Sequence, residues 1–175
     1  TYCHAEGDTT SAYLTADHAE GSRTVASAGG AHAEGSGTSA FGTLSHAEGY
    51  GTKTNGWYSH TEGATTYATG VASHAEGAAT SAIKNGSHAE GQMTITDTEY
   101  QHVEGNFNAP ATGAIHVIGN GTAASARSNI VETYSGHVVV NGPIVSTNLP
   151  VPPTANGTYT LKVTVTGGVY TYSWN

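Results

Sequence analysis

The chain has 175 residues, a formal charge of −8 and only five Lys plus Arg. A nucleic-acid-binding protein needs a basic face that displaces counterions from phosphates, so this composition argues against a nucleic-acid partner. There is no run of about 18 apolar residues, so we expect no membrane span, and the single cysteine, Cys3, excludes an intrachain disulfide framework.

A 14-residue period begins with the first residues and predicts a repeat protein. Each of eight repeats opens with His, a small residue or Val, then Glu and Gly; a Thr follows six residues after the first seven histidines, and Ala or Thr two residues later. Glycine in every repeat and empty a and d positions exclude a coiled coil. Fourteen residues suit two short strands and two tight turns, so we expect an all-β fold, a parallel β-solenoid with one coil per repeat.

Histidine and glutamate two residues apart on a strand share a face, while the residue between them points the opposite way. We therefore expect Ala and Thr inside the coil and His and Glu outside. Identical pairs at even spacing suit an axis shared by identical chains, which predicts an interchain ladder. Pairing would raise the pKa of the histidines and lower that of the glutamates, so stability should peak at intermediate pH. The residues of this His–Glu ladder are His4, Glu6, His18, Glu20, His32, Glu34, His46, Glu48, His60, Glu62, His74, Glu76, His88, Glu90, His102 and Glu104.

The same residue types allow other interpretations. Histidine and carboxylate are zinc ligands, but metal sites normally gather three or four ligands once in a fold, so the even pattern favours neither a metal nor another cofactor. No nucleophile stands uniquely beside one pair, so we expect no enzyme. The threonine column allows an ice-binding array, but one threonine per coil is better explained by an interior hydroxyl bonded to backbone.

Aromatic residues occupy variable positions between the fixed columns, where we expect them to be exposed. Such rings on a small, polar surface stack on sugars or anchor protein interfaces, although they can equally pack turns onto adjacent coils. The candidate receptor contacts are Tyr13, Phe41, Tyr50, Trp57, Tyr58 and Tyr67.

The composition becomes more apolar after about residue 102. His116 keeps the 14-residue phase, with Thr122 and Ala124 in the expected columns, and Ile130 to Thr133 fall one period later. We therefore expect the solenoid to continue through aberrant coils and to close with an apolar cap.

The rest of the chain predicts a strand and turn at 138–142, an extended proline-rich linker near 149–153 and a β-hairpin ending at Trp174. The expected organisation is a repeat roll at 1–105, aberrant coils and cap at 106–147, and linker with hairpin at 148–175.

The Ser-His-Ala-Glu-Gly segments at 45–49, 73–77 and 87–91 resemble repeats of bacteriophage tail-fibre and minor structural proteins, and segment 116–129 resembles the one that follows those repeats. The spacing is also similar to that in the heads of trimeric autotransporter adhesins. The second resemblance implies a homotrimeric, left-handed β-roll. Together they imply a phage tail fibre in the virion that joins other tail proteins upstream and binds a bacterial cell-surface glycan or protein receptor. The alternative is the head domain of a bacterial trimeric surface adhesin, which would place the chain at the cell surface.

Overall fold

The computed structural model describes residues 2–142, 161–166 and 169–174. Within these residues the chain forms strands and turns and no helix. It divides into two compact units, residues 1–141 and 142–175. The proline-rich segment near 149–153 lies outside the described residues.

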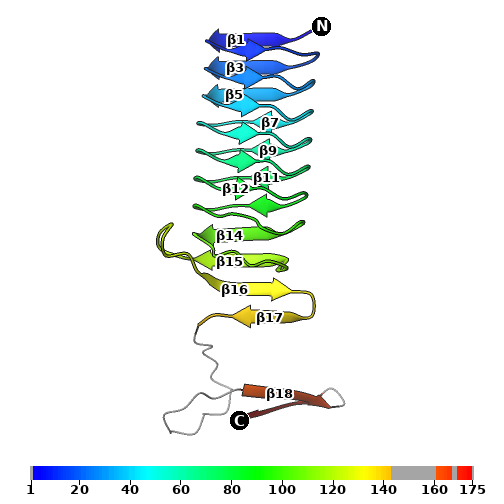
Figure 1. The fold of residues 1–175 in the computed structure, drawn as a ribbon, viewed down its shortest axis with the longest axis vertical. Coiled ribbons are helices and arrows are strands. Elements are labelled where there is room, and N and C mark those ends of the chain that lie inside the picture. The colour runs from blue at the N-terminus through cyan, green and yellow to red at the C-terminus, as the bar shows by residue number, and fades with distance from the viewer. Residues whose placement is uncertain (1, 143–160, 167–168, 175) are drawn as a thin grey trace. The chain divides into compact units, whose positions relative to one another are not determined.

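The first unit contains a β-solenoid, in which the strands of successive coils stack in parallel (Figure 1). One strand of each coil starts at the motif histidine, and each such histidine pairs in register with the histidine of the next coil. This register confirms the parallel solenoid that the period predicts. These strands are β1 His4–Asp8, β3 His18–Ser22, β5 His32–Ser36, β7 His46–Ala47, β9 His60–Thr61, β11 His74–Ala75, β13 His88–Ala89, β14 His102–Asn106 and β15 His116–Asn120.

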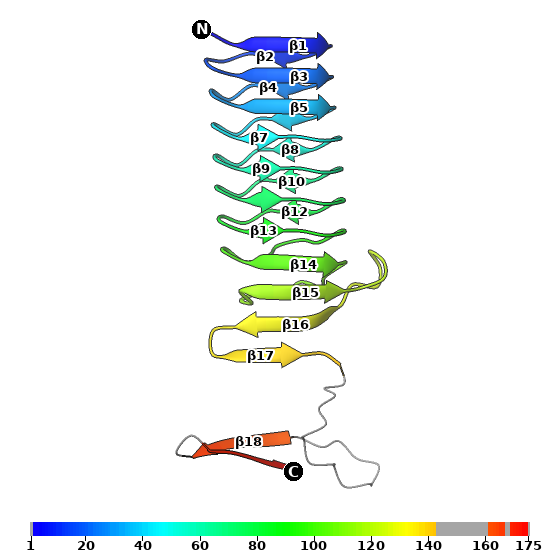
Figure 2. The same ribbon diagram turned by 180° about the vertical axis from the view of Figure 1, so that it is seen from behind.

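Shorter strands form a second, six-stranded sheet on the other side of the first six coils (Figure 2). A coil therefore has two strands joined by two turns, as its length predicts. The strands of the second sheet are β2 Ser11–Ala12, β4 Val25–Ala26, β6 Ser39–Ala40, β8 Lys53–Thr54, β10 Tyr67–Ala68 and β12 Ser81–Ala82.

Small side chains fill the space between the two sheets. The alanine that follows the motif histidine and the later Thr and Ala positions are almost completely buried in nearly every coil. This confirms that Ala and Thr face inward, and it explains how the coils stack without a conventional core: each buries a small face against its neighbours. The buried members are Ala19, Ala26, Ala33, Ala40, Ala47, Ala68, Ala75, Ala82, Ala89, Thr24, Thr38, Thr52, Thr54, Thr61, Thr66, Thr80, Thr94 and Thr96.

The sequence analysis missed a further buried column, the residue before each motif histidine from His18 to His102. In four coils it is a serine: Ser45, Ser59, Ser73 and Ser87. The Ser59 hydroxyl donates to the Gly56 carbonyl oxygen at 2.6 Å and so closes the turn that leads into the motif strand. The serines recur every fourteen residues, so the period itself contained this signal.

The solenoid ends after β15, earlier than the sequence predicts. Strand β16 (Asn129–Tyr134) pairs antiparallel with β15, and β17 (His137–Val140) pairs antiparallel with β16. Thr122 and Ala124 are exposed, because the chain reverses direction between β15 and β16. The prediction that these two residues occupy the Thr and Ala columns of a further coil is therefore wrong. Residues 130–133 do not form a further parallel coil either.

An apolar cluster lies at this end of the solenoid. Val103, Ala111, Ala114 and Val117 are buried together, and Tyr134 from β16 packs against them. The larger valines occupy the column that alanine fills in most earlier coils, so bulkier side chains fill the interior here.

In the second unit, β18 (Leu161–Thr166) and β19 (Val169–Trp174) pair antiparallel over their full length. This confirms the C-terminal hairpin that the alternating sequence predicts.

Candidate functional site

The motif histidines form one continuous stack of rings on the outer face of the first sheet. From His18 to His102, neighbouring ring centroids lie 4.5–4.9 Å apart and neighbouring planes differ by 1–11°. This separation is the distance between hydrogen-bonded strands. The stack continues to His116, which the predicted ladder did not include. The stacked side chains from His18 to His116 are 33–41 % exposed, so histidine faces outward as expected.

Carboxylates join consecutive coils of the same chain. In four places the glutamate of one coil accepts a hydrogen bond from the imidazole Nε2 of the next coil. The pairs are Glu48 with His60 at 3.2 Å, Glu76 with His88 at 3.0 Å, Glu90 with His102 at 2.9 Å and Glu104 with His116 at 3.1 Å. Motif glutamates therefore find histidine partners within one chain, and pairing between chains stays a prediction.

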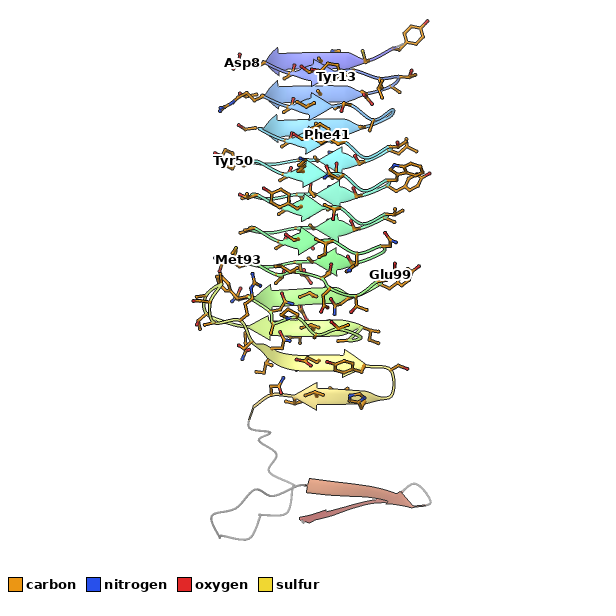
Figure 3. The ribbon with its side chains drawn as sticks, viewed as in Figure 1. Asp8, Tyr13, Phe41, Tyr50, Met93 and Glu99 are labelled. Atoms are coloured by element: carbon orange, nitrogen blue, oxygen red, sulfur yellow. The ribbon has the colours of Figure 1, made fainter. Side chains whose placement is uncertain are left out.

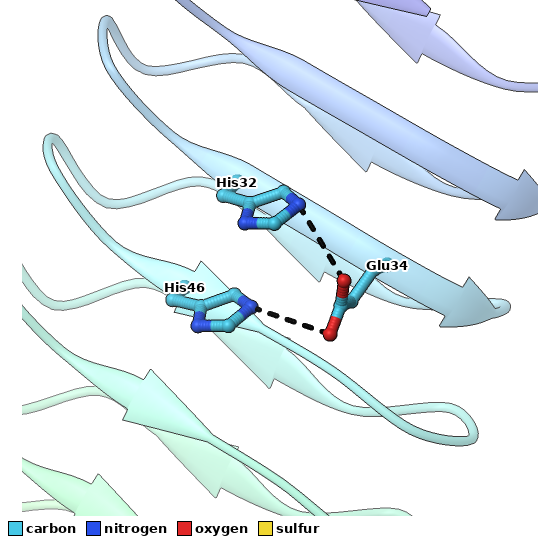
Figure 4. A group of neighbouring side chains, drawn as sticks. All are labelled: His32, Glu34 and His46. Carbon is cyan, nitrogen blue, oxygen red and sulfur yellow. Dashed lines mark ion pairs between the residues drawn. The ribbon is translucent and has the colours of Figure 1, made fainter. Parts of the chain in front are cut away.

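Four other histidines of the stack make no such hydrogen bond. The Nε2 atoms of His18, His32, His46 and His74 are buried and have no hydrogen-bond partner among the described residues. Glu34 lies between two of these rings, with its carboxylate oxygens 3.7 Å from Nε2 of His32 and 3.9 Å from Nε2 of His46 (Figure 4). Although the sequence repeats evenly, the histidines therefore differ in whether a glutamate accepts a hydrogen bond from Nε2.

Burial lowers the pKa of His46 below its ordinary value of 6.5, and repulsion from the neighbouring rings of His32 and His60 lowers it further. The pKa of His74 is lowered for the same reasons, first by burial and then by His88 and His60. Adjacent glutamates raise both pKa values but do not compensate. The expected rise in histidine pKa is therefore wrong for these two rings, because the sequence argument omitted desolvation and the stacked imidazoles.

Two histidines and the glutamate between them bring three potential metal-ligand atoms within 4.8 Å of one another at four places. We call each set a His–Glu–His group. The four groups are His32 with Glu34 and His46, His46 with Glu48 and His60, His74 with Glu76 and His88, and His88 with Glu90 and His102.

The threonine hydroxyls divide into two sets. In three coils the hydroxyl donates to the carbonyl oxygen of the motif glutamate four residues earlier; these are Thr66, Thr80 and Thr94, at 3.0–3.1 Å. This confirms the interior-hydroxyl interpretation for these coils. The hydroxyls of three earlier coils are buried with no hydrogen-bond partner in the described part of the chain: Thr24, Thr38 and Thr52.

All six candidate receptor contacts are exposed, as expected, with exposed fractions of 39–66 %. They do not form one surface. Tyr50 lies at one edge of the coils together with Asp8 and Met93, whereas Tyr13 and Phe41 lie between the two edges (Figure 3). Tyr67 lies in the second sheet, so only Trp57 and Tyr58 share a turn.

Trp57 and Tyr58 belong to the turn at the other edge, and the neighbouring coils add Leu44 and Val71 to it. The exposed fractions of the four side chains are 44–59 %. We call these four residues the edge patch. The sequence analysis did not identify Leu44 and Val71 as candidate contacts, although Leu44 lies fourteen residues before Tyr58 and Val71 fourteen residues after Trp57.

The backbone of the edge patch favours glycine. Leu44 and Tyr58 have φ of 54° and 59°, and Gly30 and Gly86 occupy the equivalent position in other coils with φ of 71° and 60°. A residue with a side chain in this left-handed region costs about 1–2 kcal/mol. Ala16, Ala72 and Tyr100 occupy the same position with φ of 62°, 52° and 57°, so this conformation belongs to the coil rather than to the edge patch alone.

No protein-family model matches this chain, and no curated protein matches it. Among the described residues, the structure contains no helix that is long and apolar enough to span a membrane. The functional argument therefore depends on the geometry of the solenoid.

Proposed function

We propose that this chain belongs to a structural and receptor-binding fibre of a bacteriophage tail. Three copies form a rod in the virion, joined to other tail proteins, and the rod attaches to a glycan on the bacterial surface. The chain catalyses no reaction. The observation that supports attachment best is the edge patch, where large apolar side chains stand exposed in a turn that favours glycine.

The coil stack supports a role as a stiff rod. Backbone groups of each coil bond to the next coil throughout the solenoid; for example, His46 N donates to Ser59 O at 3.0 Å and His60 N to Ser73 O at 2.9 Å. Such quasi-one-dimensional stacks present an extended surface at fixed spacing. A rod of this kind presents its turns at a distance from the point where it is anchored, which suits an attachment protein.

The ladder face supports association of identical chains. It presents the same half-exposed imidazole and carboxylate in coil after coil, so a second copy meets the same chemistry along its whole length. Repeated polar groups give little net stability on burial, but they can fix register and partner identity. We therefore place the ladder at the interface between the three chains.

The edge patch suits a sugar better than an apolar partner. Trp57 and Tyr58 carry polar tips, Asn55 lies two residues before Trp57, and Thr43 occupies the position of Trp57 one coil earlier. Exposed rings with nearby hydrogen-bonding groups are the usual surface for stacking against sugar faces.

A glycan array carrying bacterial surface polysaccharides tests this function. We expect the chain to bind a subset of the array, and the variant Trp57→Ala/Tyr58→Ala to bind at least about tenfold more weakly, which corresponds to about 1.4 kcal/mol. The matched control is Tyr100→Ala, because Tyr100 occupies the turn position of Tyr58 three coils away, outside the patch. Equal binding by the double variant, or binding of the chain to no glycan on the array, would contradict the glycan proposal.

A further inference from the structure

The His–Glu ladder contains imidazole nitrogens that the described residues leave unsatisfied. Nε2 of His32, His46 and His74 is buried in each case and has no hydrogen-bond partner in the described part of the chain. Leaving a buried polar atom without a hydrogen-bond partner destabilises the fold, so we expect each of these nitrogens to bind a further atom or ion. These three nitrogens all belong to His–Glu–His groups.

The clearest group brings two imidazoles and one carboxylate close together. Rings of His32 and His46 are stacked 4.5 Å apart with planes differing by 1°, and both direct Nε2 toward the carboxylate of Glu34 (Figure 4). The nitrogen-to-oxygen distances are 3.7 and 3.9 Å. Ligand atoms of a tetrahedral zinc ion lie about 3.3 Å apart, given bonds of about 2.0 Å, so the two parallel rings must tilt toward each other and the Glu34 carboxylate must approach them to bring all three atoms onto one ion.

The donor set selects the class of ion. Two neutral imidazoles and one carboxylate are common zinc ligands, whereas calcium and magnesium prefer oxygen alone. Three protein ligands leave a fourth position for water. The side chains of Glu34 and His32 are 32 % and 34 % exposed in the single chain, so the group lies on the outer face of the first sheet.

Neighbouring groups share a histidine, which limits how many ions one chain can hold. His46 belongs to two groups, and so does His88. Because one Nε2 binds one ion, each overlapping pair of groups holds a single ion. The four groups therefore provide places for two ions per chain.

The existing hydrogen bonds decide which group of each pair is used. An ion bound by His32, Glu34 and His46 leaves the bond between Glu48 and His60 intact.

The same reasoning applies farther along the stack. An ion bound by His74, Glu76 and His88 replaces the bond between Glu76 and His88 but leaves the bond between Glu90 and His102 intact. It also gives the buried Nε2 of His74 a partner. We therefore propose that each chain binds two divalent transition-metal ions, best matched by zinc, one at each of these groups.

The test is to count zinc ions on the full chain. The protein is stripped with a chelator, the chelator is removed, and equilibrium dialysis against zinc is followed by measurement of metal per chain. We expect two ions per chain, and replacement by Co²⁺ should give the visible absorption of a four-coordinate ion. Zinc binding near zero in the folded wild type would overturn the proposal.

The shared histidines give the sharpest variants. His46→Gln should reduce the count from two to one, and His46→Gln/His88→Gln should abolish binding. The matched control is His18→Gln: His18 stands in the same stack with an unpaired Nε2 but belongs to no His–Glu–His group, so two ions should remain. Two ions on the folded double variant would overturn the proposal.

Circular dichroism checks that each variant is folded. Should His46→Gln fail to fold, Glu34→Gln/Glu48→Gln removes the carboxylates of both overlapping groups and should likewise reduce the count to one. A count of two in that variant would overturn the site assignment.

Discussion

At the scale of single residues, the glycine that follows each motif glutamate shows how tightly the coils constrain the backbone. Gly63 has φ of 92°, and a Cβ there would overlap the carbonyl oxygen of Gly77 in the next coil. We expect Gly63→Ala to lower the free energy of unfolding by at least about 1–3 kcal/mol, measured by denaturant titration.

Gly51 supplies the matched control. It has φ of 63° with nothing near its missing Cβ, and Ala79 occupies the equivalent position with φ of 55°. Gly51→Ala should therefore cost only about 1 kcal/mol. An equal loss in both variants would show that close packing between coils is not the cause.

The structural role of this glycine could be predicted from the sequence, but the pKa values of the ladder histidines could not. A corner glycine follows from the period and from backbone sterics, which are local. The pKa values of His46 and His74 depend on burial and on rings fourteen residues away, which matter only once the coils stack.

Acid should destabilise the solenoid. His46 and His74 have folded pKa values below the ordinary 6.5, so the unfolded chain binds protons more readily. Their contribution to stability is fully present above about pH 6.5 and is lost as pH falls through the lowered pKa values. Melting temperatures measured in chelator should fall between about pH 7.5 and about pH 5.5. A higher melting temperature at the lower pH would contradict these directions.

At the scale of the coil, the interior accepts only small side chains. Ala75 is completely buried between the sheets, in a column where the earlier coils carry alanine or threonine. We expect Ala75→Leu to lower the free energy of unfolding by about 1–3 kcal/mol through overpacking. Thermal or denaturant unfolding measures this loss.

Ala78 is the control for this substitution, because it is exposed at a turn where the coil two repeats earlier carries Tyr50. Ala78→Leu should change stability by no more than about 0.5 kcal/mol. Similar losses for both leucine variants would contradict the narrow interior.

The coils could be predicted from the sequence, but their end could not. A fixed 14-residue period places the same residue types at the same positions of every coil, so the strands, turns and buried columns can be predicted from one repeat. His116 and Val117 preserve that pattern and do continue the first sheet. The reversal of the chain into β16 is a tertiary arrangement. It could not be predicted because Thr122 and Ala124 keep the 14-residue spacing although they do not form another coil.

At the scale of the whole molecule, the repeated ladder face gives the strongest reason to expect several chains. Its glutamates already have histidine partners within one chain, so association does not depend on completing ion pairs between chains. The proposed metal sites also lie within a single chain, so removing metal should leave the number of associated chains unchanged.

The mass of the native assembly, measured by light scattering with and without a chelator, tests the proposed fibre most directly. The account predicts three chains in both conditions. A folded single chain at the same concentrations would contradict the trimeric rod and would leave the ladder as an exposed surface.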